Sequence, residues 1–576
     1  MKIALAQQNY HIGNFEKNTE KIIEGIKWAE KQGADLVVFT ELCICGYPPR
    51  DFLEFKDFVD KCYQSLDIVR QHADTIGVLV GSPARNTQKD GKDLFNAVFL
   101  LHEKEIKAEI HKTLLPNYDV FDEYRYFEPA YDWKVMEFKG KKLAVTICED
   151  VWNMGDNPLY RQTPMEKLMP FQPDVMINLS ASPYNYAQDI VRNSIVKAHV
   201  LKYKMPMLYC NTVGSQTEII FDGGSLIYDI NGCKVSEMKY FEEDYQVFDL
   251  EKLLSRHESA PITHAGKNSD HAPYYYSAFD VGRGMDTIQY LVGEKNIDEI
   301  YHAVILGIRD YFEKMGFNKA ILGSSGGIDS AVTQVLAVDA LGKENVRALL
   351  MPSQYSSSHS VEDAETLSKN LGNPYDIVPI KNIYDTFLRE LKPIFRDAPF
   401  SVAEENIQSR TRGNLLMAVA NKFGYILLNT SNKSELATGY GTLYGDMAGG
   451  LSVLGDVYKM QVYALARYIN KKNGREIVPQ NIIDKDPSAE LRPNQKDIDS
   501  LPEYEKLDRI LYQYIELRQG PKEIIGMGYE KELVDRILKL VNSNEYKRNQ
   551  FCPIIRVSCK AFGVGRRVPI VGKYLS

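Results

Sequence analysis

The sequence predicts an α/β protein with two successive catalytic units, on three observations. Short apolar, strand-like runs alternate with longer helical patterns, as in α/β folds. The chain has 576 residues, more than one hydrophobic core normally supports. A stretch rich in Pro, Ser, Gly, His and Tyr, residues 257–284, interrupts the alternation. We therefore expect domains at residues 1–256 and 285–576, joined by a linker at 257–284.

In the first half, the apolar run KIALA near the start predicts a strand, Glu16 to Gln32 predicts a helix, and LVVFTE from Leu36 predicts a second strand. Turn residues follow most of the further strand candidates. These candidates are TIGVLVG from Thr75, NAVFLL from Asn96, KLAVTIC ending at Cys148, VMINLS from Val175 and MLYCN from Met207.

In the second half, a long helical pattern runs through Phe312 and leads to the short strand KAILG. A Gly/Ser turn follows, and then a helix begins near Ser330. No repeat of solenoid period, heptad seam or low-complexity tract is evident. The second half is therefore predicted to be another α/β unit.

Composition excludes several classes of function. The net charge of −8 and the pI near 5.8 argue against broad nucleic-acid binding, which needs concentrated Lys and Arg. The first apolar run is too short for a secretory signal or a membrane span. The eight cysteines are scattered, which indicates neither a disulfide framework nor a zinc ribbon. We expect a cytoplasmic enzyme without nucleic-acid or membrane partners.

Three polar residues stand at the ends of apolar strands in the first half: Glu41, Lys112 and Cys148. Active sites gather at strand ends in α/β sheets. A carboxylate can activate a cysteine, and a lysine can stabilise the oxyanion that forms when a thiolate attacks a carbonyl. These residue types suffice for amide hydrolysis, although a lone strand cysteine is more often a small buried hydrophobe.

The segments FTELCICGYPP, HKTLLPNYDVFDE and VTICEDVW resemble the Glu, Lys and Cys motifs of the nitrilase, or carbon–nitrogen hydrolase, superfamily. NLSASPY and NTVGSQTEIIFDGGS extend the resemblance over residues 1–250. It implies a four-layer αββα domain with Glu41 as general base, Lys112 as oxyanion stabiliser and Cys148 as nucleophile. In the glutaminase branch of the family, Tyr118, Ser182 and Gln188 would contact glutamine.

The most informative segment of the second half is GSSGGIDS, which comprises Gly323, Ser324, Ser325, Gly326, Gly327, Ile328, Asp329 and Ser330. Small residues before a helix let backbone N–H groups approach a phosphate. The lysine of a Walker A loop is absent, which argues against transfer of the γ-phosphate. Taken alone, the segment also fits an ordinary Gly/Ser turn.

This loop resembles the SGG-x-DS loop of the N-type ATP pyrophosphatases, which cleave ATP between its α- and β-phosphates. Several enzymes share that loop, but four further segments resemble NAD synthetases: MPSQYSSSHSVEDA, ENIQSRTRGNLLMAVAN, LLNTSNKSELATGYGTLYGDMAGG and PSAELRPNQ, as does the tail EYKRNQFCPIIRVSCKAFGVGRR. The resemblance implies a Rossmann-like parallel sheet. It also implies that residues 323–330 bind the ATP phosphates and that Thr430 and Lys459 bind ATP. Asp329 and Glu435 would bind Mg²⁺. The residues implied to bind deamido-NAD are Asn406, Glu435, Tyr440 and Lys547.

Together the halves resemble glutamine-dependent NAD synthetases, which are ligases of the final step of NAD biosynthesis. The resemblance implies amidation of deamido-NAD through an acyl-adenylate, with ATP as co-substrate and ammonia from a γ-glutamyl thioester on Cys148. It also implies a homo-oligomer and a sheltered passage for ammonia. Two alternatives remain open: an ammonia-using synthetase with a nitrilase-like scaffold, and a protein that senses ATP or NAD without turnover.

Overall fold

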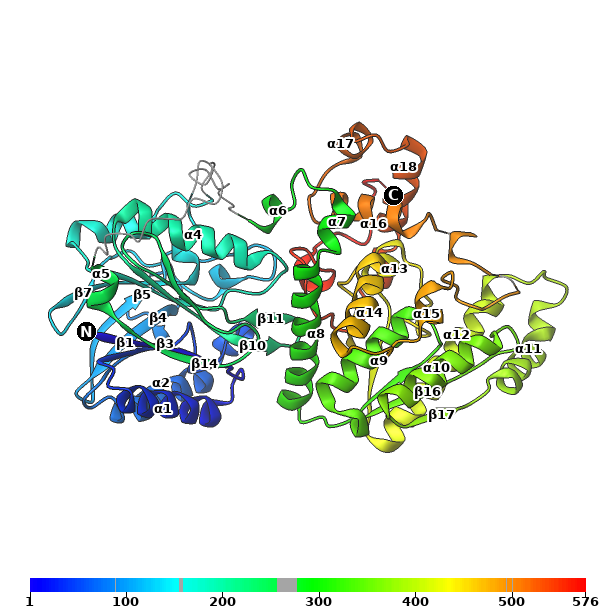
Figure 1. Ribbon diagram of the computed structural model, residues 1–576, viewed down its shortest axis with the longest axis horizontal. Helices are drawn as coiled ribbons and strands as arrows, with labels where there is room; N and C mark the ends of the chain where they lie inside the picture. The colour runs from blue at the N-terminus through cyan, green and yellow to red at the C-terminus, as the bar shows by residue number, and fades with distance from the viewer. Residues whose placement is uncertain (89, 155–158, 256–276, 494, 500, 576) are drawn as a thin grey trace. The chain divides into compact units, whose positions relative to one another are not determined.

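The computed structural model describes residues 1–88, 90–154, 159–255, 277–493, 495–499 and 501–575. The chain forms two compact units, Met1–Val281 and Gly282–Ser576 (Figure 1). Most of the predicted linker, residues 257–276, lies outside the described residues. No helix in the described part of the chain is long and apolar enough to cross a membrane.

The first unit contains two six-stranded sheets. The strand order of the first sheet is β14-β1-β2-β3-β4-β5, with bounds Asp244–Asp249, Lys2–Gln7, Leu36–Val38, Gly77–Arg85, Leu94–His102 and Glu105–His111. The order of the second is β13-β12-β9-β8-β7-β6, with bounds Lys234–Glu237, Leu226–Tyr228, Met207–Asn211, Val175–Ser180, Lys141–Ile147 and Met136–Phe138. A separate hairpin pairs β10 (Val213–Gln216) with β11 (Ile219–Asp222).

The two sheets pack face to face between two layers of helices. Alternate residues of each strand point to opposite faces, so each sheet has one face toward the other sheet and one face toward helices. Ile3 and Leu5 share the inner core with Leu143 and Val145 of the other sheet. On the outer face of the first sheet lie α1 (Phe15–Lys31) and α2 (Lys56–Gln71), and on that of the second lie α3 (Pro164–Leu168) and α4 (Gln188–Tyr203). The predicted four-layer αββα fold is confirmed.

The second unit contains one parallel sheet of order β17-β16-β15-β18-β19. The bounds in that order are Tyr375–Ile377, Val346–Leu350, Ala320–Gly323, Ile426–Asn429 and Leu451–Ser452. The chain reverses its direction of travel across the sheet between β15 and β18, and ligands of open α/β sheets bind at such a point. The predicted Rossmann-like sheet is confirmed.

Helices cover both faces of this sheet. On one face, α12 (Val402–Phe423) packs Leu416 and Ala420 against Ile321 and Leu427. On the other, Ala364 of α10 (Ser358–Leu371) packs against Ala348 and Leu350. The remaining longer helices are α8 (Glu294–Met315), α9 (Ile328–Leu341), α11 (Lys381–Phe395), α14 (Lys459–Asn473), α16 (Tyr504–Ile515) and α18 (Lys531–Ser543).

The short helices of the two units connect these elements. They are α5 (Leu250–Leu254), α6 (Ala278–Val281), α7 (Thr287–Leu291), α13 (Lys433–Thr438), α15 (Gln480–Asp484), α17 (Pro521–Gly526) and α19 (Glu545–Arg548). Of these, α13 has a capping box, in which Asn432 and Glu435 bond to each other's backbone N–H groups. The cap therefore holds Glu435 in a set orientation.

Two candidate active sites

Glu41 and Lys112 form a buried ion pair at the strand ends of the first unit. Lys112 Nζ donates to Glu41 Oε1 at 2.7 Å, and both side chains are 0% exposed. Glu41 follows β2 by three residues and Lys112 directly follows β5. Burial tends to lower the pKa of Lys112, but the charges of Glu123 and Glu41 outweigh it and raise that pKa well above its ordinary value. Lys112 is therefore a cation.

Glu123 completes this cluster, and we did not assign it a role from the sequence. Lys112 Nζ donates to both of its carboxylate oxygens at 2.8 Å. Tyr47 donates to Glu123 Oε1 at 2.7 Å, and Asn96 Nδ2 donates to Glu41 Oε1 at 2.7 Å. Glu123 ends the quoted lysine segment, so its presence was visible, but only the fold shows that it reaches the Lys112 ammonium.

Cys148 lies in a strained turn that directly follows β7. Its φ of +38° is in the left-handed region that side chains other than glycine rarely adopt. The carboxylate of Asp150 accepts from Ile147 N at 3.0 Å, and from Thr113 N at 3.0 Å and Leu114 N at 2.9 Å. Asp150 therefore ties the turn that carries Cys148 to the segment that follows Lys112. Strain held by such bonds is common at functional sites.

The Cys148 thiol is protonated at rest and needs a base. Burial and the charge of Glu41 raise the pKa of this thiol well above its usual value, while Lys112 and a hydrogen bond with Ser180 act to lower it. Because the thiolate is the nucleophile, the site must remove this proton during reaction.

Tyr118 lies beside a second buried carboxylate, Glu149. The Tyr118 hydroxyl donates to Glu149 Oε1 at 2.9 Å, and the Tyr160 hydroxyl donates to the same oxygen at 3.1 Å. Burial raises the pKa of Glu149 to about 7. Glu149 directly follows Cys148, so this carboxylate is close to the thiol, and we did not assign it a role from the sequence.

Ser182 and Gln188 lie at opposite ends of one loop. The backbone N–H of Ser182 donates to Asn211 Oδ1 at 2.9 Å. Gln188 is the first residue of α4, and its Oε1 accepts from Asn185 Nδ2 at 3.1 Å. Ser182 is buried, whereas Gln188 is partly exposed.

In the second unit, the segment 323–330 forms a compact turn between β15 and α9. Gly327 N donates to Ser325 Oγ at 3.2 Å, and Ser330 Oγ donates to Gly327 O at 3.0 Å. Gly326 has φ +77°, and a Cβ there would lie 2.1 Å from Ser360 O. Only glycine fits at this position. The turn therefore leads into the N-terminus of α9, where backbone N–H groups can bind an anion.

Lys459 joins the two carboxylates predicted to bind metal. Its Nζ donates to Asp329 Oδ2 at 2.5 Å and lies 3.6 Å from Glu435 Oε1. Burial and the neighbouring charge of Asp329 raise the pKa of Glu435 to about 8. Negative charge is therefore crowded at this point, and Lys459 neutralises part of it.

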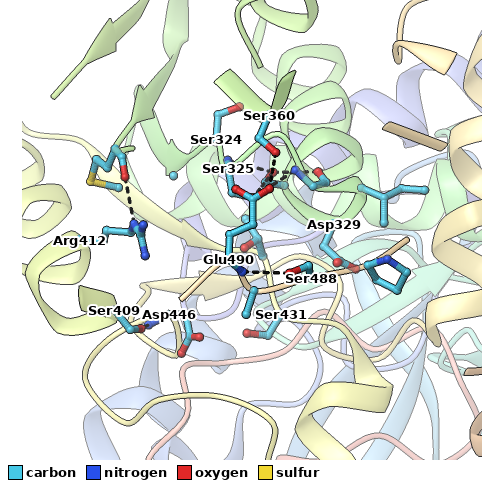
Figure 2. A pocket seen from close by; sticks show the side chains of 18 of the residues that line it. Ser324, Ser325, Asp329, Ser360, Ser409, Arg412, Ser431, Asp446, Ser488 and Glu490 are labelled. Carbon is cyan, nitrogen blue, oxygen red and sulfur yellow. Dashed lines mark hydrogen bonds between the residues drawn. The ribbon is translucent and has the colours of Figure 1, made fainter. Parts of the chain in front are cut away.

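These residues line a cavity of about 290 Å³ (Figure 2). Of the predicted ligands, Gly326, Asn406 and Lys547 are not among its lining residues. Lining residues to which we assigned no role include Arg412, Asp446, Ser488, Glu490 and Asp497. Figure 2 shows Glu490 reaching Ser360, whose Oγ donates to it at 2.7 Å. The first four lie within quoted motifs and Asp497 lies two residues after one, but only the fold brings them to one cavity.

Asn406 and Lys547 support the wall of this cavity. Lys547 Nζ donates to Gly439 O at 2.7 Å and to Gly441 O at 2.8 Å, on either side of Tyr440. Asn406 Oδ1 accepts from Thr442 Oγ1 at 2.8 Å. Tyr440 lines the cavity and donates to Asp497 Oδ1 at 3.2 Å. The structure thus places all three residues around one loop.

Comparison with known proteins assigns each part of the chain to a family. A carbon–nitrogen hydrolase family profile matches residues 2–255, and an NAD synthase profile matches residues 300–551. The glutamine-dependent NAD(+) synthetase of Synechocystis is 44% identical, over 99% of this chain and 98% of its own. The Thermotoga maritima enzyme of the same name is 40% identical, over 100% and 99%. The chain belongs to the glutamine-dependent NAD synthetase family.

Solved structures of this family agree with the assignment. The Acinetobacter baumannii glutamine-dependent NAD+ synthetase, solved with ADP, is 37% identical, with a TM-score of 0.74 over 99% of this chain and 98% of that one. The Cytophaga hutchinsonii enzyme has a TM-score of 0.79 over 100% and 98% at 19% identity, which shows the fold. The predicted family and enzyme class are confirmed: as a member, this enzyme synthesises NAD with nitrogen from glutamine.

Proposed function

We propose that Cys148, Glu41 and Lys112 release ammonia from glutamine for the amidation of deamido-NAD. The observation that carries this proposal is the buried Lys112–Glu41 ion pair at 2.7 Å, next to a cysteine held in a strained turn. A dead scaffold would have no reason to keep a buried cation and carboxylate beside a thiol, because burying charge is costly.

The proposed chemistry follows from these groups. Glu41 takes the proton from the Cys148 thiol, and the thiolate attacks the γ-carbonyl carbon of glutamine. The Lys112 ammonium donates a hydrogen bond to the oxyanion. The C–N bond then breaks, and the leaving ammonia receives the proton held by Glu41. Water, deprotonated by Glu41, hydrolyses the thioester to glutamate and restores the thiol. Glu123, bonded to Lys112, positions the ammonium.

Tyr118, Glu149 and Ser182 would hold the glutamine substrate, with Gln188 at the rim. Glu149 offers a buried carboxylate one residue from the nucleophile, and such a group attracts the α-ammonium of an amino acid. Tyr118 orients that carboxylate through its hydroxyl. This arrangement favours glutamine over a simple amide, which lacks the α-ammonium.

In the second unit, ATP would lie in the cavity with its phosphates on residues 323–330, Thr430 and Lys459. A nicotinate carboxylate is a poor acylating group, because its oxygen leaves badly. Attack of that carboxylate on the α-phosphorus gives an acyl-adenylate and pyrophosphate, and ammonia then displaces AMP to form NAD. Tyr440 and Glu435 lie on the cavity wall, and Asn406 and Lys547 would help bind deamido-NAD by holding that wall.

Asp329 and Glu435 fit Mg²⁺ when phosphates complete its coordination. Mg²⁺ prefers oxygen ligands and usually takes one or two carboxylates together with substrate phosphates and water. No group of three or more His, Cys, Asp or Glu side chains in the described part of the chain could hold a metal by itself. Burial and, after it, the charge of Asp329 raise the pKa of Glu435, so a cation bound there would favour its carboxylate form. A bound Mg²⁺ would neutralise charge on the phosphates during adenylation.

The location and assembly of the enzyme follow as further proposals. All eight cysteines are free thiols, which suits the reducing cytoplasm, and cell fractionation would test this location. We propose that copies of the chain associate through α11 and the start of α12, where apolar side chains are exposed. They are Ile383, Phe387, Ile394, Phe400 and Val402, at 37–73% exposure.

Cys148→Ala tests the central proposal. We expect glutamine-dependent NAD synthesis to be abolished and ammonium-dependent synthesis to stay within about twofold, because the nucleophile serves only the first reaction. Both activities are measured as NAD formed from deamido-NAD and ATP. Glu41→Gln and Lys112→Ala should show the same split. Equal loss of both activities would contradict the assignment of the two reactions to separate units. Unchanged glutamine use would contradict the assignment of Cys148 as nucleophile.

A further inference from the structure

Two buried hydroxyl groups form a chain beside the nucleophile. The hydroxyls of Ser180, the last residue of β8, and Tyr209, on β9, lie 2.6 Å apart. Ser180 is 0% exposed and so is Tyr209. Hydroxyls buried this deeply need hydrogen-bond partners, and these two supply each other with one bond.

The register of the sheet places this pair next to Cys148. Strands β7 and β8 are parallel neighbours, with Ile147 opposite Leu179. The next residue after Leu179 is Ser180, which ends β8, and the next after Ile147 is Cys148, which directly follows β7. The Ser180 hydroxyl interacts with the Cys148 thiol in the sense that favours the thiolate. The end of β7 and the two neighbouring strands β8 and β9 thus bring together the thiol, the serine hydroxyl and the tyrosine hydroxyl.

Two other polar groups near Cys148 direct their hydrogen bonds elsewhere, although the charge of Lys112 also favours the thiolate. Asn178 Nδ2 donates to Thr146 Oγ1 at 3.0 Å and to the backbone Cys148 O at 3.4 Å. Lys112 Nζ is bonded to Glu41 and Glu123. The titratable or charged groups that face Cys148 from the packed elements are Glu41, Lys112, Glu149, Tyr47, Tyr118 and Tyr209.

The orientation of the hydroxyl protons decides what the chain can do. Each hydroxyl has a single proton to donate. If Tyr209 donates to Ser180 Oγ, the Ser180 proton is free to point at the sulfur of Cys148. A negatively charged sulfur favours this orientation, because hydrogen bonds to ionised acceptors are stronger than neutral ones.

We propose that Ser180 is a catalytic residue of the glutaminase, which donates a hydrogen bond to the Cys148 thiolate, and that Tyr209 is its positioning residue. This inference rests on the proposed role of Cys148. The thiol proton goes to Glu41, and the Ser180 and Tyr209 protons stay on their own oxygens. The chain therefore stabilises the thiolate without relaying a proton.

Ser180→Ala removes the donor, and Tyr209→Phe removes only the hydroxyl that orients it. A bond to a charged group is worth about ten- to a hundredfold in an equilibrium. We expect Ser180→Ala to lower kcat/KM for glutamine by roughly that factor. Tyr209→Phe should have a smaller effect in the same direction. Ser65→Ala, which deletes another buried serine hydroxyl on α2, is the matched control and should behave as the parent.

The rate at which iodoacetamide alkylates Cys148, followed by peptide mass spectrometry, measures how readily the thiolate forms and reacts. In Ser180→Ala we expect roughly three- to tenfold slower alkylation at fixed pH, because a higher thiol pKa leaves fewer thiols ionised. The slowing is smaller than the loss of thiolate, since each remaining thiolate is more reactive. Adding Tyr209→Phe to Ser180→Ala should cause no further slowing, since the tyrosine acts through the serine. A general disturbance of the fold would give additive effects.

The outcomes separate this inference from the proposed function. In one outcome, Cys148→Ala abolishes glutamine use, but Ser180→Ala is alkylated and turns over glutamine at the same rates as the Ser65→Ala control. Ser180 is then not a donor, and only this inference fails. If Cys148→Ala retains glutamine use, the assignment of the nucleophile fails first. Ammonium-dependent synthesis should be parental in every variant. If Ser180→Ala does not fold, alkylation of the nearly isosteric Tyr209→Phe decides, and a parental rate there overturns the inference.

Discussion

Lys459 shows how one side chain can prepare a site for a highly charged ligand. It lies between Asp329 and Glu435, and its charge compensates two carboxylates that would otherwise repel each other. Asp329 is held on its other side by Asn432, whose Nδ2 donates to it at 2.8 Å. The carboxylates are therefore oriented before ATP arrives, and such preorganisation favours catalysis.

Replacing Asp329 tests the ATP loop at this scale. We expect Asp329→Ala to lower NAD synthesis from glutamine and from ammonium alike, by roughly a hundredfold or more, because phosphate and metal placement precede amidation. Glutamine hydrolysis itself, measured as glutamate formed, should survive in part.

Asp329→Asn is the matched control, since it keeps the size of the side chain but loses its charge. It should require more Mg²⁺ than the parent for half-maximal ammonium-dependent synthesis. NAD formation at the parental rate by Asp329→Ala would show that the ATP-loop assignment is wrong.

At the scale of elements, α11 differs from the helices of the sheet core. Among its described residues, only Tyr384 is fully buried, and its apolar side chains Ile383, Phe387 and Ile394 fall on one side when spaced at 3.6 residues per turn. Exposed apolar patches of this kind mark interaction sites. An ordinary surface helix would present charge there instead.

We expect charges on this face to dissociate the assembly. Phe387→Asp combined with Ile394→Asp would place unpaired charge in an apolar interface, so the mass in solution should fall, as measured by light scattering. Arg389→Glu, on the opposite side of the same helix, is the control and should leave the mass unchanged. A parental mass in the double variant would mean that α11 is not the interface.

At the scale of the whole molecule, two chemistries share one chain and one intermediate, ammonia. Free ammonia is mostly protonated at neutral pH, and ammonium is no nucleophile. Release to solvent would therefore waste glutamine and leave the acyl-adenylate open to water. For this reason we expect ammonia to pass between the sites sheltered from solvent, within a chain or between subunits.

Isotope competition tests this transfer. Unlabelled glutamine is supplied with labelled ammonium, at a concentration too low to sustain synthesis unaided, and label is measured in the NAD amide. Little incorporation is expected, because sheltered ammonia does not mix with the bulk pool. Label equal to that of the bulk nitrogen pool would show that the sites exchange ammonia through solvent.

Many elements around the two sites could be predicted from local pattern. The predicted run from Val175 coincides with β8, and the helix expected near Ser330 is α9, which begins at Ile328. The strands that were not predicted include β5, β13 and β14. They are partly exposed and lack a continuous apolar run, so their pairing with neighbouring strands, rather than their own composition, makes them strands.

The sequence by itself determined the α/β class, the order of the motifs and, through them, the family and the residues assigned to each reaction. Tertiary structure decided which side chains meet. Glu123 reaches Lys112, Ser180 lies beside Cys148, and Glu490 enters the cavity near Ser360. A motif records residue types along a short segment. Contacts between residues 11 to 130 positions apart depend on strand order and register, which are set by packing across the whole unit.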